Sequence, residues 1–152
     1  MKAVVLKKFG GTENFEMEEI PIPSIKPGYV LIKVHASSVN PVDFKIRQGL
    51  LPIGPCLPAV LHGDLSGEIV EVGQGVTDFR NGDPVYGCVG GFSELPGVLT
   101  EFALADARLL AHKPRNLSFE EAAALPLVAI TSWNALVDRA KVKTFRMQNW
   151  AN

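Results

Sequence analysis

The side chains that could bind a metal ion or act as a strong nucleophile are few in this chain. It contains two cysteines, Cys56 and Cys88, and three histidines among 152 residues. The cysteines do not form a CxxC pair, and no cysteines and histidines cluster together. This pattern excludes a zinc-finger-type site and gives no indication of a disulfide framework.

Candidates for acid–base chemistry are equally sparse. Tyr86 and Lys45 could donate a proton, although the pattern around them favours a packed tyrosine and a solvent-facing lysine. His35 alternates with the buried positions of a predicted strand, which favours a half-exposed strand residue. Asp64 stands in a glycine-rich stretch, where it could serve a site or cap backbone amides, and we favour the structural role. The sequence alone identifies no catalytic residue.

Composition limits the classes of function. About 47% of the residues are hydrophobic and 20% are charged, which favours a packed core in a domain of ordinary size. The formal net charge of −1 offers no electrostatic argument for a nucleic acid or an anionic membrane as partner. The N-terminal "MKAVVLKKFGG" is too short for a signal-peptide core or a membrane span. The sequence therefore predicts a reduced, cytoplasmic protein.

Short strands separated by turns are predicted for the first hundred residues. The clearest one places Val30, Ile32, Val34 and Ala36 on one face. The segments that read as strands are "KAVVL", "NFEMEEIPIP", "YVLIKVHASSVN", "GEIVEVGQGV" and two short runs in "LTEFALADARLLAHKP". This pattern predicts a mainly β body.

One short helix interrupts the β body at "NPVDFKIRQG". Asn40 can cap this helix, Pro41 fits its first turn, and Asp43 occupies the capping-box position. Gly49 can end it.

A helical arm is predicted after the β body. In "NLSFEEAAALPLVAITSWNALVDRA", Ser118 and Glu121 form a capping box, and Pro126 is expected to split or kink the segment. The predicted organisation is a body over residues 1–115, followed by a helical arm and tail over 116–152.

Five stretches follow one another along the chain: "AVVLKKFGG", "KPGYVLIKVHASSVNPVDFKIRQG", "GDLSGEIVEVGQGVTDFRNGDPVYG", "LTEFALAD" and "LSFEEAAALPLVAITSWNAL". In this order they resemble the catalytic, GroES-like domain of the medium-chain dehydrogenase/reductase superfamily, and most closely its zinc-independent branch of NADPH:quinone reductase-like enzymes. The resemblance runs from residue 1 to about residue 143. It implies an α+β fold, a partly open GroES-like β-barrel with a C-terminal helical arm. In full-length relatives it implies hydride transfer from NADPH to a quinone or enone.

The resemblance also implies that no metal is bound. Zinc-dependent members place a cysteine where Asn40 stands and a His-Glu pair where Gly63 and Asp64 stand. His62 is one position early, and on a strand that shift turns the side chain to the opposite face. We therefore expect no zinc site, a hydrogen-bonded His62 near the cleft, and packing or loop roles for both cysteines.

Three residues are candidates for contacts with the cofactor. In relatives, the positions that match Asn40, Asp43 and Thr131 line the nicotinamide side of the cleft. Capping explains Asn40 equally well, and a helical threonine often bonds its own backbone.

The end of the chain departs from the family pattern. In relatives, the arm leads into a strand and a glycine-rich turn that opens the Rossmann domain and cradles the pyrophosphate. Here "VKTFRMQNWAN" follows instead, and no G-x-G-x-x-G occurs after it. The sequence thus predicts a chain truncated before its Rossmann domain, with weak or absent NADPH binding and no activity alone. Alternative splicing, a frameshift and a truncated gene all remain open as the origin.

Other functions stay open. The chain could be a non-enzymatic module that pairs with a full-length paralogue, one chain of a split reductase, or a vestigial product. We expect exposed apolar residues on the arm and tail to be covered in a homo-oligomer. These residues are Trp133, Leu136, Val137 and Trp150.

Overall fold

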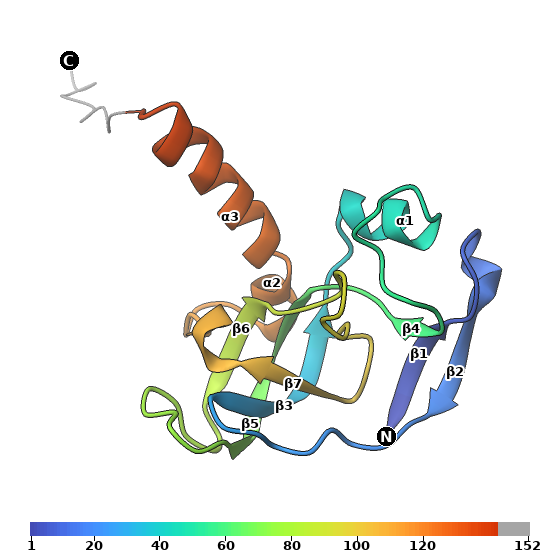
Figure 1. The fold of residues 1–152 in the computed structure, drawn as a ribbon. Helices are drawn as coiled ribbons and strands as arrows, with labels where there is room; N and C mark the ends of the chain where they lie inside the picture. The colour runs from blue at the N-terminus through green and yellow to red at the C-terminus, as the bar shows by residue number, and fades with distance from the viewer. Residues whose placement is uncertain (143–152) are drawn as a thin grey trace.

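The computed structural model describes residues 1–142, which form an α+β fold of two antiparallel sheets and three α-helices (Figure 1). The described residues do not close into a single barrel, so the sheets form the partly open arrangement that the sequence predicts. Trp150 lies outside the described residues.

The smaller sheet has three strands in the order β2-β1-β4. In β1 the apolar run that the sequence marks as a strand buries Ala3, Val5 and Leu6. A single 3₁₀ turn, η1, leads from the first strand into the second. The bounds are β1 (Lys2–Leu6), η1 (Thr12–Asn14), β2 (Phe15–Glu19) and β4 (Ala59–Val60).

The larger sheet has five strands in the order β7-β3-β5-β6-β8, all antiparallel. The predicted inward face of β3 is confirmed by Val30 and Ile32, which are fully buried. Leu31 is buried as well, beside an irregularity in the register between β3 and β5. The bounds are β3 (Tyr29–Ser37), β5 (Asp64–Val72), β6 (Pro84–Cys88), β7 (Phe102–Asp106), η2 (Ala107–Leu109) and β8 (Leu110–His112).

The segment over residues 99–101 joins the two sheets. The backbone amide of Val4 donates to the carbonyl of Leu99 over 2.8 Å, and that of Val34 donates to Glu101 over 2.9 Å. Buried side chains, most of them from the larger sheet, form one apolar core, and a smaller apolar core includes a residue of α1. The smaller core is centred on Leu6, Ile46 and Leu61.

Glycine is required where β5 crosses close to β3. A Cβ atom added to Gly67 would lie 2.2 Å from the carbonyl oxygen of Lys33. Only a residue without a side chain fits there, because the two backbones approach each other so closely.

Helix α1 (Pro41–Arg47) has the predicted capping. The backbone amide of Asn40 donates to Oδ2 of Asp43 over 2.6 Å, and Gly49 follows the helix at φ = 73°. The helix stands apart from the larger sheet, above β4 (Figure 1).

The arm consists of α2 (Phe119–Ala123), α3 (Pro126–Trp133) and the π-helical segment η3 (Asn134–Arg139). The capping box of Ser118 and Glu121 and the break at Pro126 both form as predicted. Phe119 stacks on His35 with ring centroids 4.3 Å apart, which fixes the start of the arm to β3. Beyond Leu127 every described side chain is exposed, and the arm extends away from both sheets (Figure 1).

Within residues 1–142, the helices are too short or too polar to cross a lipid bilayer.

Candidate functional site

A cleft of about 490 Å³ lies between α1 and α3. It brings together Asn40 and Thr131, two of the three residues proposed for cofactor contacts. Polar groups therefore face an otherwise apolar wall, a composition that is common in small-molecule sites. The lining residues are Asn40, Pro41, Val42, Lys45, Leu51, Leu127, Val128, Thr131 and Ser132.

Asn40 is held rigidly at the start of α1. Its side chain is only 7% exposed, and its Nδ2 donates to Oδ2 of Asp64 over 2.9 Å. Because a carboxylate can only accept hydrogen bonds, this contact sets which end of the amide is nitrogen. The same side chain takes part in the capping box, in which it faces the backbone amide of Asp43.

Asp43 has a different placement. Its side chain is only 3% exposed, it is not among the residues that line the cleft, and its Oδ2 accepts from the Asn40 backbone. Burial raises the pKa of Asp43, and the hydrogen bond from Asn40 partly opposes this shift. In this structure Asp43 thus supports Asn40 from behind, and a direct cofactor contact stays a prediction.

The candidate proton donors separate clearly. Lys45 lines the cleft and is exposed, whereas Tyr86 lies in β6 opposite Ser66 and Ala111 and is not part of the lining. Tyr86 lies within its strand and is half-buried.

His62 departs from its prediction. It precedes β5 with φ = 70°, so the alternation of a strand does not govern its side chain. Its Nδ1 is buried and has no hydrogen-bond partner among the described residues, so the expectation of a hydrogen-bonded histidine is wrong for this atom. Burial lowers the pKa of His62, and the nearby Asp43 carboxylate opposes the shift. The left-handed turn at this position gave no signal in the sequence.

Cys88 does not provide an activated nucleophile. Burial, with a further contribution from the Asp64 carboxylate, raises the pKa of Cys88 to about 12. A thiol with so high a pKa carries almost no thiolate near neutral pH. Cys56 lies exposed in the loop before β4, as expected.

The donor set near the cleft does not suit a metal ion. Among residues 1–142, no group of three or more histidine, cysteine, aspartate or glutamate side chains is arranged to hold one. The Asp64 carboxylate, which matches a zinc-site position in relatives, accepts hydrogen bonds from Ser38, Asn40 and Leu127. Its oxygens are therefore already engaged.

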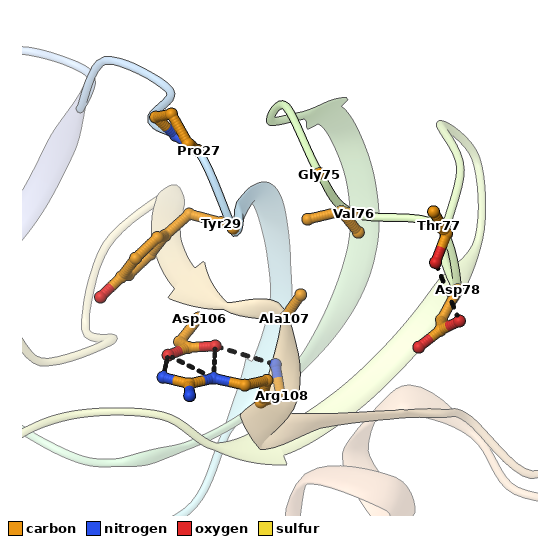
Figure 2. A pocket seen from close by; sticks show the side chains of 10 residues that line it. Pro27, Tyr29, Gly75, Val76, Thr77, Asp78, Asp106, Ala107 and Arg108 are labelled. Carbon is orange, nitrogen blue, oxygen red and sulfur yellow. Dashed lines mark hydrogen bonds and ion pairs between the residues drawn. The ribbon is translucent and has the colours of Figure 1, made fainter.

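A second cavity, of about 320 Å³, lies at the opposite end of the larger sheet (Figure 2). Arg108 turns toward Asp106 and pairs with it over 2.6 Å, which holds the pKa of Asp106 at about 2. The Arg108 guanidinium and the Asp106 carboxylate thus form an ion pair with each other, and we assign no chemistry to this cavity. No local sequence pattern marks this cavity, because its lining comes from three separate turns.

Known proteins share sequence and fold with this chain. Residues 26–115 match the model of the alcohol dehydrogenase GroES-like domain. The chain is 41% identical over 140 residues to a chloroplast envelope quinone oxidoreductase homolog of Arabidopsis thaliana, covering 88% of this chain and 41% of that protein. It is 42% identical over 143 residues to an NADPH-dependent alkenal/one oxidoreductase of the same plant, covering 90% and 37%.

Solved structures show the same similarity. A protein of the alcohol dehydrogenase superfamily from Novosphingobium aromaticivorans superposes with a TM-score of 0.89 at 45% identity, over 94% of this chain and 43% of that one. The chain thus spans less than half the length of the relatives that it matches.

Proposed function

We propose that this chain, which belongs to the alcohol dehydrogenase GroES-like domain family, forms the catalytic-domain portion of an NADPH-dependent quinone or enone reductase. Its homologues are quinone and alkenal oxidoreductases of the medium-chain dehydrogenase/reductase superfamily. In this proposal residues 1–115 form the catalytic body and residues 116–152 the arm and tail. The observation that carries it is the cleft that unites Asn40 and Thr131.

The lining of this cleft suits a nicotinamide and a conjugated carbonyl. When bound, NADPH supplies the hydride that such a reduction needs. Asn40 and Thr131 offer polar atoms to the ring's carboxamide or to the acceptor's oxygen, and apolar side chains beside them offer contact to the faces of the ring. Val42, Leu51 and Val128 form this apolar wall.

The remaining candidates take supporting roles. Asp43 orients Asn40 through the capping contact described above. Lys45 lines the cleft and could donate a hydrogen bond or proton to a carbonyl oxygen. Tyr86 is less well placed for this role because it does not line the cleft. Replacing Lys45 with methionine keeps its apolar stem, so this variant separates charge from packing.

We also propose that the reaction proceeds without zinc. The support comes from the engaged oxygens of Asp64 and from asparagine at position 40, which is not a typical zinc ligand. Metal analysis of the purified protein tests this directly: zinc that co-purifies at one equivalent would contradict it.

For a polypeptide limited to residues 1–152 we propose weak NADPH binding and little turnover, whatever sequence adjoins these residues in the natural protein. The sequence contains no G-x-G-x-x-G turn after the arm, and in this family such a turn anchors the pyrophosphate. Without that anchor the hydride donor is poorly oriented, and orientation supplies much of the rate.

A second candidate function is an interaction module, which the exposed arm favours. Trp133 is 62% exposed, Leu136 55% and Val137 40%, so an apolar surface is open to a second copy or to a paralogue. A split reductase, in which a separate chain supplies the nucleotide domain, fits the same surface.

One experiment separates these functions. The purified chain is mixed with NADPH and several quinones while NADPH absorbance is followed, and cofactor binding is titrated in parallel. NADPH binding that is lost when a cleft residue is replaced, without turnover, supports the split or incomplete reductase. No binding, together with a stable oligomer in sizing chromatography, favours the module. Rapid turnover by the chain alone contradicts the proposal that it is inactive by itself.

A further inference from the structure

Asp64 connects three segments that are distant in the sequence. Its side chain is fully buried at the start of β5. Oδ2 accepts from Ser38 Oγ over 3.2 Å and from Asn40 Nδ2 over 2.9 Å. The backbone amide of Leu127 donates to both carboxylate oxygens over 3.2 Å.

These contacts reach both walls of the cleft between α1 and α3. Asn40 caps α1 on one side, and Leu127 lies in the first turn of α3 on the other. A buried carboxylate is well suited here, because the first turn of a helix has free amides and favours negative charge. A single side chain thereby contacts the two elements that carry Asn40 and Thr131.

We propose that Asp64 is a positioning residue, a buried clamp that sets the placement of α3 relative to Asn40 and so holds Thr131 at the cleft. This inference deepens the proposed function and rests on it, because the cleft is the site where a nicotinamide and its acceptor would bind. Asp64 itself does not line the cleft, and it acts through the residues that do.

Ser66 provides a matched control on the same strand. It is also fully buried, and its hydroxyl donates to the carbonyl of Phe119 in α2, so it ties the same arm to the same sheet. A residue that only anchors the arm should behave like Ser66. Replacing a residue that positions the walls of the cleft should change hydrogen exchange at the Leu127 amide and the affinity for a ligand, whereas replacing Ser66 should change neither.

The first test uses hydrogen exchange of the ligand-free chain at the amide of Leu127. Asp64→Asn removes the negative charge and replaces one acceptor oxygen with an NH₂ group, so the Leu127 amide loses its charged acceptor and one of its two oxygen partners. We expect exchange at Leu127 to accelerate by about tenfold or more, which is the scale of one lost hydrogen bond to a charged group. Ser66→Ala should leave exchange at Leu127 within about twofold of wild type once global stability is matched. Unchanged exchange in Asp64→Asn overturns the proposal.

Asp64→Glu is the second variant in case Asp64→Asn does not fold. It keeps the charge but displaces the carboxylate by one methylene group. The proposal predicts faster exchange at Leu127 in this variant too, whereas wild-type exchange at Leu127 in a folded Asp64→Glu protein overturns it.

The second test measures coupling to the cleft, with reduced nicotinamide mononucleotide as the probe in an NMR titration. If Asp64 acts by placing Thr131, the double variant Asp64→Asn/Thr131→Val loses no more affinity than the weaker-binding single variant. Multiplicative losses overturn the positioning role. A wild-type chain that does not bind the probe contradicts the proposed function, and exchange at Leu127 then decides the role of Asp64 by itself.

Discussion

At the residue scale, Asn40 combines the N-cap position of α1 with a place in the lining of the cleft. The sequence presents capping and ligand contact as alternatives for this position. In the structure the backbone of Asn40 takes part in the cap through Asp43, while its side chain bonds Asp64 and lines the cleft. A capping residue is therefore well placed to present a rigid amide to a ligand.

Thr131 gives the simplest test of the cleft. Thr131→Val keeps the shape of the side chain and removes its hydroxyl, so we expect affinity for reduced nicotinamide mononucleotide to fall about fivefold, the scale of one neutral hydrogen bond. Because Thr131 is exposed, stability should change by less than about 0.5 kcal/mol. Thr12→Val, at an exposed position remote from the cleft, is the matched control and should bind like wild type.

His62 should make stability depend on pH. Burial lowers its pKa below the ordinary 6.5, so near pH 6 the unfolded chain binds a proton that the folded chain does not. The free energy of unfolding should therefore decrease as the pH falls below about 6.5. His62→Asn removes the titrating group, and asparagine tolerates the positive φ at this position.

Urea denaturation of both proteins at pH 7.5 and pH 5.5 measures the effect. The loss between the two pH values should be larger for wild type than for His62→Asn. Equal losses would show that His62 does not contribute.

The two cysteines should differ strongly in reactivity. Cys56 is exposed, whereas the thiol of Cys88 has a pKa raised to about 12. Iodoacetamide at pH 8 should therefore label Cys56 well before Cys88, and denaturant should equalise the two. Mass spectrometry of the labelled peptides provides the measurement, and preferential labelling of Cys88 in the folded protein would refute the assignment.

At the element scale, most strands and helices could be predicted because their signals are local. Alternating apolar residues mark β3, and the caps at Asn40 and Ser118 mark two helix starts. The cleft could not be predicted from such patterns alone. It depends on Asp64 reaching the amide of Leu127, a contact between residues 63 positions apart.

The resemblance to a family compensated for part of this gap. It pointed to Asn40 and Thr131, which the structure places together, and to Asp43, which lies behind the cleft wall. The turn at His62 was missed, because a positive φ at a histidine leaves no sequence signature comparable to that of glycine.

The start of the arm offers a test of capping. Ser118 Oγ accepts from the backbone amide of Glu121 over 3.2 Å. Ser118→Ala removes this contact and should lower the free energy of unfolding by about 1 kcal/mol. Ser118→Asp retains an acceptor and should remain close to wild type. Thermal denaturation compares the three proteins, and an alanine variant as stable as wild type would show that the cap is energetically unimportant.

At the scale of the whole molecule, the exposed arm is the least usual feature. Apolar side chains cover it beyond Leu127, and isolated helices of this length are marginal in water without packing partners. This observation motivates the proposal that the arm packs against a second protein surface. Its exposed apolar residues include Val128, Ile130, Trp133, Leu136 and Val137.

We expect the chain to self-associate through this surface. Leu136→Asp places a charge in its middle and should shift a concentration-dependent oligomer toward the monomer in sedimentation experiments. Asp138→Asn, also on the arm, removes a charge instead and should not dissociate the oligomer. A wild-type chain that remains monomeric at all concentrations would argue against the homo-oligomer.

We propose above all that residues 1–142 supply the nicotinamide side of a reductase cleft, and residues 1–152 contain no G-x-G-x-x-G turn that could anchor a pyrophosphate. The most direct test of this proposal compares the affinities of NADPH and reduced nicotinamide mononucleotide for the same preparation, with Thr131→Val as the reference. We expect weak affinities that agree within a few-fold and that both decrease in Thr131→Val. NADPH binding that is orders of magnitude tighter than binding of the mononucleotide would contradict it.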